Sequence, residues 1–100
     1  MILTGDVISA ADALRIGLVN KVVEPTELLP EAEALARKII ANAPLAISYS
    51  VEAVERGLDA TQEEGLILEA SLSALCCETR DMREGVHAFI EKRPPRFEGQ

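Results

Sequence analysis

The chain has 100 residues, which is enough for one hydrophobic core but too short for two. Hydrophobic residues make up 48% of it and aromatic residues only 3%, so any core consists mainly of Leu, Ile, Val and Ala. Seventeen acidic residues against 10 basic ones give a net charge of -7, which argues against nucleic acid as a partner.

The N-terminal part of the sequence predicts one short helix followed by one short extended segment. Ser9 and Asp12 have the spacing of a capping box, in which each residue satisfies an amide of the other. Gly17 is expected to close this helix, because glycine accepts the left-handed backbone found at helix ends. The β-branched run over residues 18–23 then predicts extended backbone, which Pro25 ends.

Two amphipathic helices are predicted in the middle of the chain. Apolar residues recur at three- and four-residue steps from Thr26 to Ile40, and Pro30 either lies in the first turn of this helix or distorts it. A second helix restarts at Pro44, and Gly57 is expected to close it. Its apolar stripe comprises Ile47, Val51, Val54 and Leu58.

Two more helices are predicted towards the C-terminus. Thr61 and Glu64 form a second capping box, and the helix behind them is apolar around so much of its circumference that burial on more than one side is expected. Thr79 opens the last helix, which ends before Pro94, and residues 94–100 form an irregular tail. The predicted buried face of the last helix comprises Met82, Val86, Phe89 and Ile90.

The fold class is therefore all-α, with four or five helices in a single domain over residues 1–100. No stretch is long and apolar enough to cross a membrane, and the first residues lack the basic start of a secretion signal. Adjacent Cys76 and Cys77 are poorly placed for a structural disulfide, which favours a reduced compartment. We expect a cytoplasmic protein without membrane contact.

The residues that could carry chemistry all have a structural interpretation as well. Glu63 and Glu64 could act as acid and base, but adjacent helical positions diverge by about 100° and first-turn acids stabilise the helix dipole. His87 could be a base or a half-exposed helical residue, and Cys76 a nucleophile or a small buried hydrophobe. The Cys and His spacings match no metal site. We assign no catalytic residue and no metal ligand.

One basic patch stands out on the acidic chain. It comprises Lys92, Arg93 and Arg96, around Pro94 and Pro95. These cations could bind a phosphate group, or they could complement the negative end of the preceding helix.

Several segments resemble the C-terminal portion of the enoyl-CoA hydratase/isomerase (crotonase) family. Leu3-Thr4-Gly5-Asp6 and residues 13–23 resemble the start of that portion, and residues 42–46 and 64–66 match between the two ends. Arg83-Glu84-Gly85, Glu91-Lys92-Arg93-Pro94-Pro95 and Phe97 resemble its end.

This resemblance implies a fold and a parent reaction. The family's C-terminal helices form an irregular orthogonal bundle, and the commonest reaction is hydration of a 2-enoyl-CoA to a 3-hydroxyacyl-CoA. The family's oxyanion hole and catalytic glutamates precede the segment that Leu3-Thr4-Gly5 matches, so the chain alone is expected to be inactive. The alternatives are a fragment of an enoyl-CoA isomerase and a free-standing helical protein-interaction module.

The resemblance also implies a ligand and an assembly. Lys92 matches a lysine that contacts the nucleotide of CoA, and Phe89 matches an aromatic residue near the adenine. Core packing is the other interpretation of Phe89, which shares a stripe with Val86 and Ile90. No cofactor is implied, since acyl-CoA is the substrate of the family. The chain alone is expected to bind acyl-CoA weakly if at all, and a homo-oligomer is implied, trimeric or hexameric as in the family.

Overall fold

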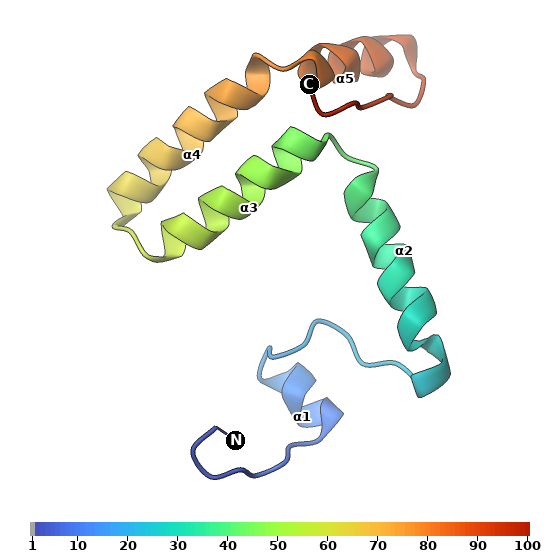
Figure 1. The fold of residues 1–100 in the computed structure, drawn as a ribbon, viewed down its shortest axis with the longest axis vertical. Coiled ribbons are helices and arrows are strands. Elements are labelled where there is room, and N and C mark those ends of the chain that lie inside the picture. Colours follow the sequence, from blue (N-terminus) through green and yellow to red (C-terminus); the bar gives the residue numbers. More distant parts are fainter. Residues whose placement is uncertain (1) are drawn as a thin grey trace. The chain divides into compact units, whose positions relative to one another are not determined.

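The computed structural model describes residues 2–100, which form five α-helices, one 3-10 turn and no strand (Figure 1). The all-helical class is therefore confirmed. The elements are α1 (Ala10–Arg15), η1 (Pro25–Glu27), α2 (Leu28–Ile40), α3 (Pro44–Leu58), α4 (Gln62–Cys77) and α5 (Arg80–Glu91).

The chain divides into two compact units, Met1–Ala34 and Leu35–Gln100, with the boundary inside α2. The single domain expected over residues 1–100 stays a prediction. Within residues 2–100, no helix has both the length and the apolar content needed to cross a membrane.

The caps of α1 agree in part with the sequence. Asp12 donates its N–H to Ser9 Oγ at 3.0 Å, but its carboxylate accepts from the Ser9 hydroxyl rather than from the Ser9 amide, so only half of the capping box forms. Gly17 has a φ of +75°, and Leu18 donates its N–H to the carbonyl of Ala13 at 2.9 Å. This 6→1 bond closes the helix as predicted.

The segment between α1 and α2 contains neither helix nor strand over residues 18–24 of the described chain. Its backbone reaches the extended conformation at Glu24, with φ -63° and ψ 148°, before the turn that begins at Pro25. Pro30 is the third residue of α2, which confirms its place in the first helical turn.

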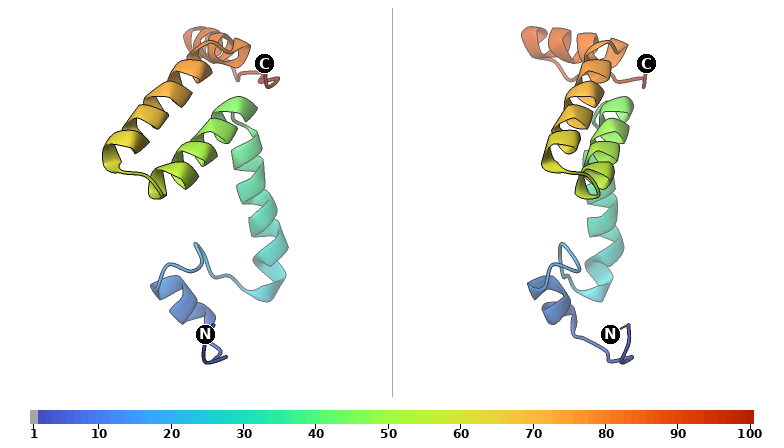
Figure 2. Two further views of the ribbon diagram at one scale, coloured as in Figure 1. Left: turned by 60° about the vertical axis from the view of Figure 1, so that its left-hand side comes forward. Right: turned by 90° about the vertical axis from the view of Figure 1, so that its left-hand side faces the viewer.

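α3 and α4 lie side by side in both views of Figure 2. Gly57 lies inside α3, which continues to Leu58 and is capped at Asp59, so the prediction that Gly57 closes the helix is wrong. A Cβ atom built at Gly65 would lie 3.6 Å from the Cα of Gly57. This distance is an ordinary van der Waals contact, and a Cβ atom built at Gly57 would meet no atom within 4 Å, so the packing of α3 on α4 does not require glycine at position 57.

The capping box of α4 is confirmed in both directions. Glu64 donates its N–H to Thr61 Oγ1 at 3.3 Å, and its carboxylate accepts from the Thr61 N–H at 3.0 Å. The bond from the Thr61 hydroxyl holds the pKa of Glu64 below its usual value. The structural interpretation of Glu64, as a capping residue, therefore explains its position and its contacts.

Few side chains are buried in the described chain. The buried set comprises Ala13, Leu72, Asp81 and Ala88. The predicted burial of the α5 stripe is wrong, since Met82, Val86, Phe89 and Ile90 are exposed. On α4, Leu72 is buried but Leu66, Ile67 and Leu75 are exposed. An apolar stripe shows which face of a helix favours a partner, but not whether the same chain provides that partner.

Candidate ligand-binding site at the end of α5

The C-terminal segment 93–100 has no regular secondary structure and turns back along α5 (Figure 1). The main-chain carbonyl of Gln100 accepts the N–H groups of Arg80 at 2.6 Å and of Asp81 at 3.1 Å. These amides belong to the first turn of α5, where no helical carbonyl is available to them. The segment that follows the C-terminal end of α5 thus provides a hydrogen-bond acceptor for the free N–H groups at the N-terminal end of the same helix.

Asp81 anchors this segment. Its side chain is only 3% exposed, and its two carboxylate oxygens accept the N–H groups of Glu98 and Gly99, each at 2.8 Å. Gly99 has a φ of +75°, which a residue with a Cβ adopts rarely. A buried carboxylate with a donor on each oxygen is well satisfied, so Asp81 holds the returning chain against α5.

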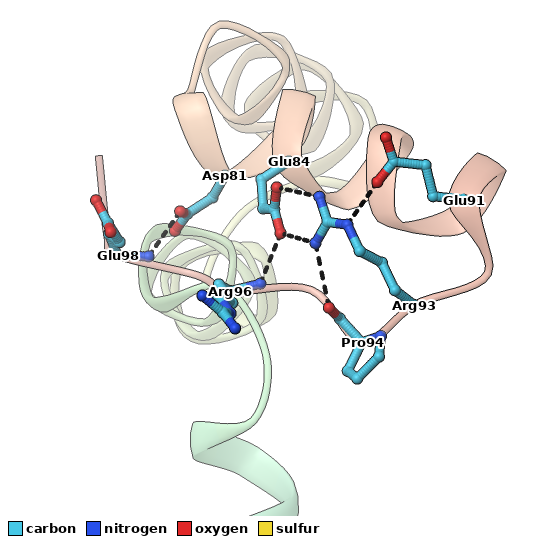
Figure 3. Close-up of polar contacts among 7 residues, drawn as sticks. All are labelled: Asp81, Glu84, Glu91, Arg93, Pro94, Arg96 and Glu98. Atoms are coloured by element: carbon cyan, nitrogen blue, oxygen red, sulfur yellow. Dashed lines mark hydrogen bonds and ion pairs between the residues drawn. The ribbon is translucent and has the colours of Figure 1, made fainter.

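Glu84 anchors the other end of the segment (Figure 3). Its carboxylate accepts two bonds from the Arg93 guanidinium, at 2.6 and 2.9 Å, and the Arg96 N–H at 2.8 Å. Glu91 accepts from Arg93 Nε at 2.6 Å. The Arg93 guanidinium and the Arg96 amide lower the pKa of Glu84 to about 2, and the two carboxylates raise the pKa of Arg93.

The free energy of unfolding is therefore expected to depend on the charge of Glu84. The unfolded chain takes up this proton near pH 4.5, but the folded chain only near pH 2, so the stabilisation is full above pH 4.5 and is lost as the pH falls towards 2. Urea unfolding across this window should show a shallower acid loss for Glu84→Gln than for the unsubstituted chain. Glu55→Gln, at an exposed position on α3, is the control. Equal acid dependence in all three proteins would contradict the expectation.

The partners of Arg93 change the interpretation of the basic patch. Its guanidinium is already bound by Glu84 and Glu91, so it is not available as a free phosphate ligand. Lys92 is exposed, and within residues 2–100 its ammonium forms no hydrogen bond or ion pair. Of these two cations, Lys92 is the one open to a ligand.

Lys92 also has an unusual backbone. Its φ of 52° and ψ of 41° are left-handed, and it is the one residue other than glycine with a positive φ in the described chain. The Arg93 N–H reaches the Ala88 carbonyl at 3.0 Å, closing α5 in the way that Gly17 closes α1. This conformation costs a residue with a Cβ about 1 to 2 kcal/mol.

Phe89 lies in the same final turn, because the Lys92 N–H bonds to the Phe89 carbonyl at 3.3 Å. Its side chain is 85% exposed, so the core-packing interpretation is wrong for this chain. Phe89 borders a cavity of about 310 Å³ whose lining is largely apolar and includes Met82, Val86 and Phe97. The structure therefore brings the two residues expected to bind CoA to one end of α5.

The remaining candidates do not form a site. His87 is exposed rather than half-exposed, Cys76 is half-buried and Cys77 is exposed. No cluster of three or more metal-ligating side chains occurs among residues 2–100.

Sequence reasoning assigned no role to Asp81 and Glu84. They occupy positions i and i+3 of α5, upstream of Arg93 and Arg96. Two acids on one helix face, followed by two arginines, are the sequence feature that could have indicated contacts between α5 and the segment after it.

Comparison with known proteins identifies relatives over nearly the whole chain. The model of the family described as "Enoyl-CoA hydratase/isomerase" matches residues 1–100. A crotonyl-CoA hydratase of Syntrophomonas wolfei is 43% identical over 97 residues, which cover 97% of this chain and 37% of the relative. A short-chain-enoyl-CoA hydratase of Clostridium acetobutylicum is 45% identical, covering 93% of this chain and 36% of the relative.

A solved structure shows the same likeness. The crystal structure of an enoyl-CoA hydratase from Bacillus anthracis matches with a TM-score of 0.90 at 36% identity, over 93% of this chain and 36% of that one. The chain thus spans little more than a third of the length of these relatives.

Proposed function

Because the chain belongs to the enoyl-CoA hydratase/isomerase family, we propose that it is the C-terminal helical region of a hydratase-like cytoplasmic enzyme. The parent reaction is hydration of a 2-enoyl-CoA to a 3-hydroxyacyl-CoA. The observation that carries this proposal is the 43% identity to a crotonyl-CoA hydratase over 97% of the chain but only 37% of that relative. The C-terminal assignment rests on the resemblance of Glu91-Lys92-Arg93-Pro94-Pro95, and the orthogonal bundle stays a prediction for the assembled enzyme.

Hydration requires acid and base groups together with hydrogen-bond donors, and two glutamates of this chain are engaged in structural contacts instead. Water must add its hydroxyl to C3 and a proton to C2, while donors stabilise the charge that develops on the thioester oxygen. Glu64 is occupied in a helix cap and Glu84 in an ion pair with Arg93. We therefore propose that the rest of the enzyme supplies the catalytic groups and that this chain alone is inactive.

Two alternatives remain as second candidates for specific reasons. An enoyl-CoA isomerase parent is favoured by the family description, which names both reactions. A free-standing interaction module is favoured by the exposed apolar stripes of α4 and α5. An in-frame core sequence directly upstream of the gene segment would exclude the module.

The ligand contact in this proposal lies at the end of α5. The unpaired ammonium of Lys92 would bind the 3'-phosphate of CoA through a charge-assisted bond, and the exposed ring of Phe89 would stack on the adenine. Acyl-CoA is the substrate here, and no further cofactor is involved. Affinity of the chain alone is expected to be weak, since most of the pocket is absent.

Titration of isotopically labelled chain with CoA tests this contact. Chemical-shift changes at Lys92 and Phe89 are expected to be larger with CoA than with dephospho-CoA, and to shrink as salt screens the exposed charges. Lys92→Ala should remove the difference between the two ligands, and Lys38→Ala, at an exposed position on α2, should not. The same response to both ligands, or none at α5, would contradict the proposed contact.

Self-association is the second expectation from this proposal. The exposed apolar residues Leu66, Ile67 and Leu75 on α4 would be covered in an oligomer, which the family resemblance implies to be a trimer or hexamer. Sedimentation should show association at high concentration, weakened by Ile67→Glu and unaffected by Glu55→Gln. A strict monomer that binds no hydrophobic dye would contradict this expectation.

A further inference from the structure

We propose that Glu84 is a positioning residue, which holds the following chain so that Lys92 keeps its left-handed backbone and presents its ammonium to the nucleotide phosphate. This inference rests on the proposed function, because Lys92 has a ligand only if the chain binds CoA. Glu84 itself does not touch the ligand, and it acts through Arg93.

The geometry fixes the residue that directly follows Lys92 at two points. The Arg93 N–H bonds to the carbonyl of Ala88 at 3.0 Å, and the guanidinium bonds to both oxygens of Glu84 at 2.6 and 2.9 Å. Paired Arg–carboxylate bonds are directional as well as strong. With Arg93 held at its backbone and at its tip, the dihedral angles of Lys92 are strongly restricted.

Glu84 also fixes the chain beyond this point. Its Oε1 accepts the Arg96 N–H at 2.8 Å, so the segment is held on both sides of Pro94 and Pro95 (Figure 3). Glu91 makes one further bond to Arg93, at Nε, from an exposed position. Glu84 therefore provides the greater part of the restraint, and Glu91 a smaller part.

The choice of residue at position 92 supports a role for the ammonium. Gly5, Gly17 and Gly99 occupy the other positive-φ positions of the described chain, as expected for a conformation that glycine adopts without strain. Only position 92 places a long cationic side chain there, and its conformation persists because neighbouring contacts determine it. A glycine would close α5 with less strain but would carry no charge.

The experiment compares Glu84→Gln with Glu91→Gln in labelled chain, first without ligand. A strong nuclear Overhauser effect between the N–H and Hα of Lys92 reports its positive φ. We expect this signal in the unsubstituted chain and in Glu91→Gln, and its loss in Glu84→Gln. If Lys92 then spends about a tenth of its time in the left-handed state, the apparent Kd for CoA rises about tenfold, with less than a twofold change for Glu91→Gln.

Two more variants separate positioning from general damage. Lys92→Gly should keep α5 closed, seen as protection of the Arg93 amide that bonds to the Ala88 carbonyl, and lose the preference for CoA over dephospho-CoA. The double substitution Glu84→Arg with Arg93→Glu restores an ion pair with the opposite polarity and should recover part of the affinity. The amides of Thr61 and Glu64, at the far end of α4, report whether each variant is folded.

Each outcome decides the proposal. Unchanged φ and CoA affinity in Glu84→Gln would overturn it while leaving the proposed function intact. If Glu84→Gln fails to fold, recovery in the double variant supports the proposal and the absence of recovery overturns it. If the unsubstituted chain shows no response to CoA at Lys92, both the proposed CoA contact and this inference are wrong.

Discussion

The purified 100-residue chain is expected to hydrate a short 2-enoyl-CoA no faster than the uncatalysed reaction. In the proposed assignment, the donors that stabilise the thioester oxygen lie in the rest of the enzyme, and removing one such donor commonly costs about 3 kcal/mol of transition-state stabilisation. The suggestive acid Glu64 is held in its capping box. The loss of the conjugated enoyl-thioester absorbance measures the rate directly.

A complete hydratase, such as the Clostridium acetobutylicum relative, is the positive control for this assay. The negative control is the chain carrying Glu64→Gln, which should give the same background rate. Turnover that survives repurification and disappears in Glu64→Gln would show that the chain has its own active site. The proposal that it is inactive alone would then be wrong.

Asp81→Ala is expected to have the largest effect on stability of any single substitution at α5. The buried carboxylate accepts the amides of Glu98 and Gly99, and hydrogen bonds to a charged group contribute about 1.5 to 3 kcal/mol each. Loss of both should lower the free energy of unfolding by about 3 kcal/mol. It should also release the amides of Glu98 and Gly99 to hydrogen exchange.

Two variants calibrate this result. Asp81→Asn keeps one acceptor oxygen and should retain protection at one of the two amides. Asp59→Ala, at the exposed cap of α3, should change the free energy of unfolding by less than about 0.5 kcal/mol. Unchanged protection at both amides in Asp81→Ala would show that the returning segment does not depend on this carboxylate.

Local signals allowed most of the helices to be predicted. Thr61, Thr79 and Gly17 mark helix ends because a cap involves residues three to five positions apart, and such spacings are visible in a sequence. The wrong prediction that Gly57 closes α3 also came from a local spacing. A glycine near a helix end resembles a cap, but α3 continues through Gly57 to Leu58 and is capped at Asp59.

Of the residues described at the end of α5, only the two proposed ligand contacts were singled out from the sequence. The resemblance drew attention to Lys92 and Phe89, but it gave no indication that Phe89 would be exposed or that Lys92 would have a left-handed backbone. The contacts of Asp81 with Glu98 and Gly99 join positions 17 and 18 apart in a segment without periodicity. Local pattern reasoning has no basis for predicting such contacts.

The way in which α5 holds the last segment has a consequence for evolutionary drift in the family. Asp81 and Glu84 bind the segment at positions 96 and 98 through main-chain amides, which every amino acid except proline possesses. The side chains at these two positions can therefore be exchanged while the path of the chain is kept. Distant homologues could differ almost freely at positions 96 and 98 and still be recognisable by two acids three residues apart on the preceding helix.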